Sequence, residues 1–392
     1  MAEARVEPQP KRGWLRAIGL AATLLVAGCQ GAIPKGRVPA PAAPPPPPIT
    51  SGLPEDQARH RIALLVPLSG PDSAVGQSIA NAANLALIDT GGKKVRMTTY
   101  DTGGGAVAAA QRAVADGNKL FLGPLLSADA RAIAPVAARA GIPIVSFSND
   151  SSIAGNGVYV LGFVPDQSIR RVVEYAHSRG ITKFAGLMPS GLYGRNASTV
   201  FIKSVEAAGG KVVAMKNYDR DPKSVNVAAR TLGLNQPYEA ILIADGGRIA
   251  AVATPAIRKG PSPDARVLGT ELWNADNLVA RSPSLQGAWY AAVSDSLYRQ
   301  LAGKYRVRYG KEPFRLASMG YDAVLLTVRI AAEWKVGAPF PINELEDRGG
   351  FSGIDGAFRF GSNNIAERAL EVYEVRAGGG SVVSPAPRGF TN

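Results

Sequence analysis

The side chains that most often carry enzyme chemistry are scarce in this sequence. Its 392 residues include two histidines, His60 and His177, and a single cysteine, Cys29. The histidines lie far apart in the chain. A histidine-based hydrolytic triad and most zinc sites therefore lack recognisable components, and one cysteine excludes an internal disulfide. We expect no catalytic residue, no metal and no cofactor.

A glycine-rich stretch, Asp101–Gly105, follows a predicted strand and raises the alternative of a phosphate-binding loop. It lacks the glycine spacing of dinucleotide-binding loops and the Lys-Ser/Thr ending of a P-loop. A turn in which Asp101 leads into the next helix is favoured instead. The sequence also contains no Gly-x-Ser-x-Gly elbow, so an enzyme is the least favoured class of function.

Small and hydroxylated residues gather instead in five predicted loops that each follow a strand. In open parallel sheets, ligands bind at the carboxyl ends of the strands, where such loops meet helix N-termini. The candidate ligand-binding residues in these loops are Ser69, Ser127, Ser146, Ser148, Tyr193 and Asp245. Each also has a structural interpretation, as a helix cap or as part of a turn. The loops converge on one cleft if two lobes face each other.

The elements that would position these loops alternate between strand and helix. Apolar runs predict strands, and amphipathic stretches of ten or more residues predict helices between them. Strands are predicted at 62–66, 95–100, 120–122, 142–145, 158–161, 183–187, 211–215, 240–244, 266–268, 356–360 and 370–375. Helices are predicted at 74–89, 106–116, 128–139, 168–178, 194–208, 225–232, 297–309 and 316–333. Apolar strands separated by helices predict an α/β fold with parallel sheets covered on both faces.

The alternation of strands and helices begins at residue 61 and again after residue 166, which predicts two lobes. The last predicted helices and strands must pack onto sheets already formed, so the lobes are expected to be discontinuous in sequence. We assign residues 60–163 plus 293–340 to the first lobe and 164–292 plus 341–376 to the second. Residues 377–392 have no apolar periodicity and are expected to form a flexible tail.

The beginning of the chain has the layout of an export signal. Basic residues precede an uncharged run that is shorter than the roughly 20 residues needed to cross a bilayer, so residues 1–28 are predicted to be a signal peptide. The run ends Leu25-Val26-Ala27-Gly28-Cys29 and resembles a bacterial lipobox, which implies lipidation of Cys29. Residues 29–59 include five consecutive prolines and predict an extended tether.

The formal net charge of +13 invites a nucleic-acid interpretation. The cations are scattered, however, and the densest group spans Arg299 to Arg315 on a predicted helix whose charged side is most simply a solvated face. We expect no nucleic-acid partner, and at most a weak attraction to anionic envelope surfaces.

Several ordered short motifs resemble the type I periplasmic binding proteins of the Leu/Ile/Val-binding kind. The matching stretches are Pro67–Gly70, Gly123-Pro124 with Ser127, Gly141–Pro143 before Ser146, Tyr193-Gly194, Gly320–Ala323 and Phe351–Gly356. The resemblance spans about residues 60–376. It implies two Rossmann-like lobes, three crossover segments and an interlobe ligand cleft that closes by hinge motion.

The resemblance also implies roles for individual residues. Ser127 matches a hydroxyl that binds a ligand carboxylate beside a helix start, and Tyr193 matches an aromatic residue of the far lobe that lies against the ligand. The sequence departs from the amino-acid binders at Phe147–Asp150, where Asp150 would repel a carboxylate. An acidic partner for a ligand ammonium is not evident, although Asp245 is an alternative.

Two functions follow from the resemblance. The lipid anchor, the proline tether and the fold are similar to the C-terminal domain of penicillin-binding-protein activators, and Gln30 after Cys29 implies the outer membrane, facing the periplasm. The expected partner is then a class A penicillin-binding protein. The alternative is a substrate-binding protein of an ABC importer for branched-chain or other amino acids, with a small ligand in the cleft.

Overall fold

The computed structural model describes residues 58–274, 277–387 and 390. The described residues belong to one compact unit. The predicted signal peptide, Cys29 and the tether up to residue 57 lie outside the described residues, so the structure bears on none of them.

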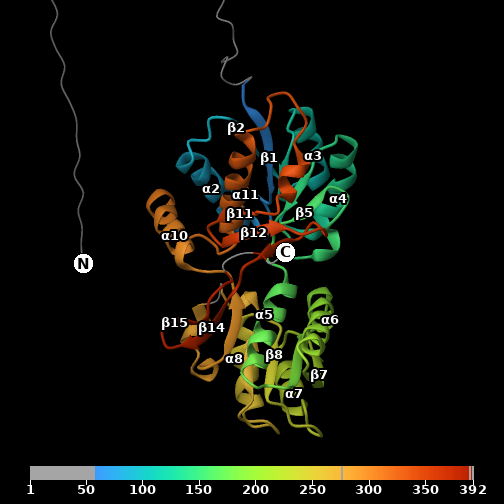
Figure 1. Ribbon diagram of the computed structural model, residues 1–392, viewed down its shortest axis with the longest axis vertical. Helices are drawn as coiled ribbons and strands as arrows, with labels where there is room; N and C mark the ends of the chain where they lie inside the picture. Colours follow the sequence, from blue (N-terminus) through green and yellow to red (C-terminus); the bar gives the residue numbers. More distant parts are fainter. Residues whose placement is uncertain (1–57, 275–276, 388–389, 391–392) are drawn as a thin grey trace, which may run out of the picture. The chain divides into compact units, whose positions relative to one another are not determined.

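The first sheet is parallel throughout and lies between two helical layers (Figure 1). Its strands, in the spatial order β2-β1-β3-β4-β5, are β1 (His60–Val66), β2 (Val95–Asp101), β3 (Phe121–Leu122), β4 (Ile144–Ser146) and β5 (Val158–Val160). Its helices are α2 (Ser73–Asp89), α3 (Ala106–Ala115), α4 (Ser127–Arg139), α10 (Ser296–Tyr309) and α11 (Ala317–Ala331). Successive strand residues point to opposite faces, so Ile62 and Leu64 pack toward α2 and α11, whereas Ala63 and Leu65 pack toward α3 and α4.

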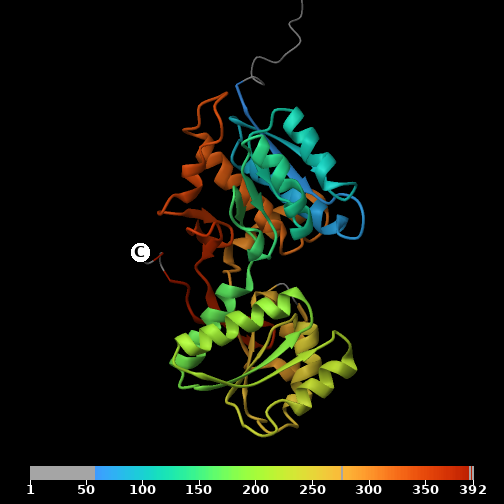
Figure 2. The same ribbon diagram turned by 90° about the vertical axis from the view of Figure 1, so that its right-hand side faces the viewer.

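The second sheet repeats this arrangement and adds two antiparallel strands at one edge. Its order is β15-β14-β10-β9-β8-β6-β7. The strands are β6 (Lys183–Pro189), β7 (Lys211–Tyr218), β8 (Ala240–Ile243), β9 (Arg266–Gly269), β10 (Trp289–Ala292), β14 (Glu371–Arg376) and β15 (Gly379–Ser384). The helices are α5 (Pro165–Ser178), α6 (Leu192–Ala207), α7 (Pro222–Thr231), α8 (Gly247–Ile257) and α9 (Asn277–Arg281). Helices α5 and α6 cover one face, and α7 and α8 cover the other (Figure 2).

These two sheets confirm the predicted α/β fold with two lobes and parallel-type sheets. Helix α8 and strand β10 were not expected from the sequence. Helix α8 begins at a Gly-Gly pair and contains Pro255, both of which weaken a helical pattern, and its burial between neighbours compensates for this. Among the described helices, none combines the length and hydropathy of a membrane-spanning segment.

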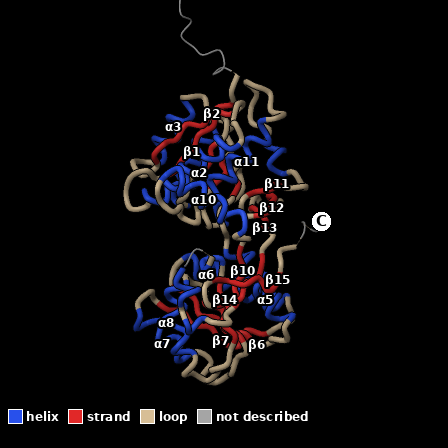
Figure 3. Tube along the Cα trace, turned by 90° about the vertical axis from the view of Figure 1, so that its left-hand side faces the viewer, coloured by secondary structure: helices blue, strands red, loops and turns tan. Residues whose placement is uncertain are grey.

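The late strands divide between the lobes differently from the expectation. Residues 341–376 were assigned to the second lobe, but β11 (Phe351–Gly353), β12 (Gly356–Phe360) and β13 (Ala366–Arg368) form a separate antiparallel sheet beside α11 (Figure 3). Phe351, Phe358 and Phe360 are buried in the core that α2 and α11 share. This burial of aromatic surface returns the chain to the first lobe before β14 joins the second.

The expected flexible tail, residues 377–392, contains a strand. Residues 379–384 form β15, which pairs antiparallel with β14 and supplies hydrogen bonds to the edge of the second sheet. The remaining described residues of the tail, 377–378, 385–387 and 390, belong to no helix or strand.

Three segments carry the chain between the two sheets, as Figures 1 and 2 show: residues 161–164, 293–295 and 369–370. Hydrogen bonds connect the elements beside these segments to each other and to the segment 293–295. Gln167 Nε2 donates to the carbonyl oxygen of Ala366 over 2.7 Å, and the Tyr373 hydroxyl donates to the carbonyl oxygen of Val293 over 3.4 Å. The crossing point is therefore a bonded junction and not three independent linkers.

The contact between α2 and α11 predicts unequal effects of the same substitution. An added Cβ at Gly320 in α11 would lie 2.5 Å from the backbone oxygen of Ile79, whereas one at Gly303 in α10 would meet nothing within 4 Å. We expect Gly320→Ala to lower the free energy of unfolding by about 1–3 kcal/mol through overpacking. Gly303→Ala should leave it unchanged or raise it by up to about 1 kcal/mol, because alanine favours helices.

Chemical denaturation of both variants tests this expectation. Equal stability of Gly320→Ala and the natural protein would contradict the close approach of the two helices.

Candidate functional site

A cavity of about 410 Å³ lies where the two lobes meet at the crossover segments. Its volume is within the range of small-molecule sites, roughly 300–1,000 Å³. Most of the wall is apolar, from Val75, Leu125, Leu126, Phe147, Phe163, Val164, Leu272, Val293, Leu316, Met319 and Leu370. The polar part of the wall includes Asp72, Asn149, Gln167, Ser168, Glu271, Asn274, Arg315 and Arg368. Such a wall suits a ligand with an apolar body and few polar groups.

The cavity lies at the carboxyl ends of parallel strands in both sheets. Leu125 and Leu126 follow β3, and Phe147 follows β4, in the first lobe; Glu271 follows β9, and Val293 follows β10, in the second. This is the location expected for ligands of open α/β sheets. The fold thus brings loops from two sheets to one small volume.

The predicted serines at the end of β4 and just after it, Ser146 and Ser148, do not line the cavity. The buried Ser146 hydroxyl donates to the carbonyl oxygen of Pro124 over 2.9 Å and accepts from the amide of Ser148 over 3.2 Å. The Ser148 hydroxyl accepts from the amide of Asp150 over 3.1 Å. The alternate residues, Phe147 and Asn149, line the cavity instead.

Asp150 is held away from the cavity by an ion pair. Its Oδ2 lies 2.5 Å from Nη2 of Arg131, and its Oδ1 accepts from the amide of Ser152 over 3.0 Å. Burial opposes the charged form, but the bonds from Ser152 and Arg131 outweigh it and lower the pKa of Asp150. The expected repulsion of a ligand carboxylate is weakened because Arg131 offsets the charge of Asp150 and because Asp150 does not line the cavity.

Ser127 and Ser69 lie outside the cavity wall. Ser127 is the first residue of α4, and its hydroxyl is 3.4 Å from Nη1 of Arg131; the N-cap of the helix is Leu126. Ser69 is exposed, and its amide donates to Asp101 Oδ1 over 3.2 Å. The amides of Leu68 and Gly103 donate to the same oxygen, so Asp101 organises a turn.

Asp245 is engaged within the second lobe. Its Oδ2 accepts from the Tyr218 hydroxyl and from Nε of Arg220, each over 2.8 Å, and it does not line the cavity.

Tyr193 does not line the cavity but is hydrogen-bonded to Glu271, which does. Its hydroxyl donates to Glu271 Oε1 over 3.0 Å, and the Ser168 hydroxyl donates to Glu271 Oε2. Burial raises the pKa of the Glu271 carboxyl to about 7, although both hydroxyl groups favour the charged form. The second lobe therefore presents to the cavity an acid that is close to its titration point at neutral pH.

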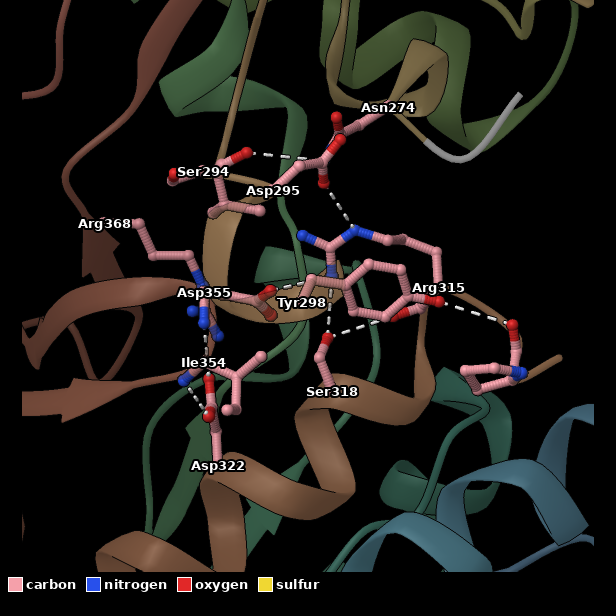
Figure 4. A network of polar contacts seen from close by, with 12 residues as sticks. Asn274, Ser294, Asp295, Tyr298, Arg315, Ser318, Asp322, Ile354, Asp355 and Arg368 are labelled. Carbon is pink, nitrogen blue, oxygen red and sulfur yellow. Dashed lines mark hydrogen bonds and ion pairs between the residues drawn. The ribbon is translucent and has the colours of Figure 1, made fainter. Parts of the chain in front are cut away.

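Two further residues of the wall, Arg315 and Arg368, belong to a network of buried charges that extends behind it (Figure 4). Arg315 Nη1 lies 2.7 Å from Asp355 Oδ1, and its Nε lies 3.4 Å from Asp295 Oδ1. The guanidinium also lies over the ring of Tyr298, with 4.1 Å between Cζ and the ring centroid. Burial opposes its charge, but Asp355 and Asp295 more than offset this, so the pKa of Arg315 is raised.

Arg368 and Asp322 complete the network. Arg368 Nη2 donates to the carbonyl oxygen of Leu161 over 2.8 Å, and its Cζ lies 4.9 Å from the ring centroid of Phe163. Burial lowers the pKa of Arg368 despite the nearby carboxylates of Asp355 and Asp322. Asp322 Oδ1 accepts from the amide of Ile354 over 2.6 Å, and burial, with Asp355 nearby, raises its pKa to about 7.

Sequence reasoning missed the charged residues of this cavity. Arg315 was expected on the solvated face of a helix, but it lies in the loop before α11 with a side chain only 7% exposed. One sequence signal for the network was available in the motif Phe351–Gly356. A Cβ at Gly353 would lie 2.4 Å from Asp322 Oδ2, so the glycine is needed to leave space for the Asp322 carboxylate.

The histidines are remote from this chemistry. His60 stacks on Trp334 with 3.9 Å between ring centroids, and neither His60 nor His177 lines the cavity. Within residues 58–274 and 277–387, no group of three His, Cys, Asp or Glu side chains is close enough to hold a metal ion. The arrangement is suited to holding a ligand by polar contacts at two ends of an apolar volume.

Comparisons with known proteins agree with this geometry. The sequence profile of the family described as "Periplasmic binding protein" matches residues 60–380. An uncharacterized protein of Rickettsia prowazekii is 27% identical over 183 residues, which are 46% of this chain and 49% of that protein. The match therefore spans about half the length of this relative.

Solved structures share the fold at low sequence identity. A branched-chain amino acid ABC transporter periplasmic ligand-binding protein from Burkholderia xenovorans has a TM-score of 0.68 and 18% identity, over 84% of this chain and 95% of that one. The substrate-binding protein LivJ from Streptococcus pneumoniae, in complex with isoleucine, has a TM-score of 0.62 and 17% identity, over 83% of this chain and 100% of that one.

The raised pKa of Glu271 predicts a pH-dependent effect of Glu271→Gln. The carboxyl is protonated in both states well below its ordinary value of 4.5, and the unfolded chain ionises first as the pH rises. Stability of the natural protein should therefore fall between pH 4.5 and about 7 relative to the glutamine variant. Melting temperatures across pH 4–8 measure this difference.

The exposed Glu344 provides a matched control for this substitution. Glu344→Gln should give a melting profile parallel to that of the natural protein. Parallel profiles for Glu271→Gln as well would contradict the raised pKa.

Proposed function

The chain belongs to the periplasmic binding protein family, and from this premise we propose that it captures a small, mostly apolar ligand for an ABC importer. The observation that carries the proposal is the 410 Å³ cavity between the lobes, whose apolar wall has charged residues at two places. Proteins of this family are typically binders without catalytic activity, and the family implies an extracellular or periplasmic location.

The type I, Leu/Ile/Val-binding kind of fold supports an amino-acid-like ligand. The LivJ structure contains isoleucine, and the Burkholderia protein is described as a ligand-binding protein of a branched-chain amino acid transporter. An apolar side chain would fit among Phe147, Phe163 and Met319, and Glu271 could accept from an ammonium group. The importer hypothesis therefore takes precedence over the activator hypothesis.

The activator hypothesis remains as a second candidate because of Cys29, Gln30 and the proline run, all outside the described residues. Neither the LivJ protein nor the Burkholderia protein is described as an activator. Addition of the purified protein to a class A penicillin-binding protein distinguishes the two hypotheses. Faster glycan-strand synthesis would support the activator, and an unchanged rate would remove it.

We further propose that Cys29 carries a lipid that attaches the mature protein to an envelope membrane. The lipobox-like stretch 25–29 supports this, and Gln30 favours the outer membrane. In cells that express the full chain, Cys29→Ala should move the protein from the membrane fraction to the soluble fraction. Cys29→Ala protein that stays in the membrane fraction would refute the lipid anchor.

Ligand binding is expected to raise the melting temperature in a panel of apolar amino acids, their amides and small apolar acids. A ligand at 100 times its Kd stabilises the folded state by about 2.7 kcal/mol. Val75→Trp should abolish the shift, because Val75 in α2 lines the cavity and is partly buried.

The matched control is Val107→Trp, since Val107 is exposed in α3 and lies outside the cavity wall. It should retain the shift. The absence of a shift with every compound, in the natural protein, would refute the proposed function.

A further inference from the structure

The two buried arginines of the cavity differ in how fully their charge is matched. Nε and Nη2 of Arg315 also lack hydrogen-bond partners among the described residues, but ion pairs with Asp355 and Asp295 compensate its charge. Arg368 donates one side-chain hydrogen bond, from Nη2 to Leu161, whereas its Nε and Nη1 are buried without a hydrogen-bond partner among the described residues. A buried guanidinium with unused donors is costly, because neither water nor protein replaces the lost hydration.

The carboxylates near Arg368 are already engaged elsewhere. Asp355, the stronger of its two counter-charges, is shared with Arg315 over 2.7 Å. Asp322 accepts the amide of Ile354 and, with a pKa near 7, carries only part of a negative charge at neutral pH. This agrees with the opposite pKa shifts of the two arginines, raised for Arg315 and lowered for Arg368.

We propose that Arg368 receives a carboxylate of the ligand, and that the ligand is therefore a small, mostly apolar carboxylic acid. This inference rests on the proposed ligand-binding function and adds to it the residue that selects the ligand. Arginine donors form short, charge-assisted hydrogen bonds to carboxylates, which would satisfy the unused nitrogen atoms. Arg368 lines the cavity and is 8% exposed there, so it forms part of the wall that a ligand contacts.

The rest of the wall orients such a ligand. Phe147, Phe163 and Met319 offer apolar surface for its body. Glu271 and Asp72 disfavour a second negative charge at their own positions, since like charges repel. The acid group is therefore directed toward Arg368.

This assignment differs from the expectation for Ser127. The resemblance placed the ligand carboxylate at the start of α4, but Ser127 does not line the cavity and contacts Arg131. Arg368 is instead the last residue of β13, beside the crossover segments. The carboxylate is thus recognised at the junction between the lobes, where Arg368 also bonds Leu161.

Matched acids and amides test the charge requirement directly. The probes are 4-methylpentanoate and phenylacetate, each with its amide, titrated calorimetrically into the purified full-length protein. We expect each acid to bind at least about tenfold more tightly than its amide, because the amide lacks the charge that Arg368 requires.

Three variants then locate the effect. Arg368→Gln should remove the preference for the acid, and Arg368→Lys should keep part of it, because lysine retains the charge but loses the planar fork. Ser127→Ala should bind as the natural protein does. The melting temperature of each variant shows whether it is folded, and the acid-to-amide ratio of the natural protein is informative even if Arg368→Gln does not fold.

The outcomes separate this inference from the proposed function. If none of the probes and no amino acid binds, the proposed function fails and the inference fails with it. If compounds bind but acids and amides bind equally, or if Ser127→Ala and not Arg368→Gln loses the acid preference, the inference alone is overturned.

Discussion

A guanidinium group inside a protein must find carboxylates or carbonyl oxygens, because desolvation of its charge is costly. In this chain two such groups, Arg315 and Arg368, lie at the junction between two sheets, among aromatic rings and three aspartates. Asp295, Asp322 and Asp355 come from the second crossover segment, from α11 and from the turn between β11 and β12. The network therefore ties the late segments to the first lobe, through Asp355 on Arg315 and Arg368 on Leu161.

The network also explains why the lobes are discontinuous in sequence. The small sheet β11–β13 packs Phe351 and Phe358 against the first lobe and places Asp355 beside Arg315. The chain then passes Arg368 and enters β14 of the second lobe. Every crossover segment thus meets the charge network or its immediate neighbours. The cavity is lined by residues of these segments, so the proposed ligand would contact the same junction.

Local pattern was sufficient to predict most of the fold. Alternate residues of β1 serve two different cores, and such continuous apolar strands between amphipathic helices are typical of covered parallel sheets. The site was harder, because its charged residues are far apart in sequence and no spacing relates Glu271 to Arg315 or Arg368. At the end of β4, alternate residues point in opposite directions, so Ser146 and Ser148 are buried while Phe147 and Asn149 line the cavity.

The central claim is that the interlobe cavity holds an apolar acid with its carboxylate on Arg368. The most direct measurement is a crystal structure of the protein grown with saturating 4-methylpentanoate. We predict the carboxylate at roughly 2.7–2.9 Å from a guanidinium nitrogen of Arg368, with the alkyl chain against Phe147 and Met319. A carboxylate bound beside Ser127 at the start of α4, or a cavity that contains no ligand under these conditions, would contradict the claim.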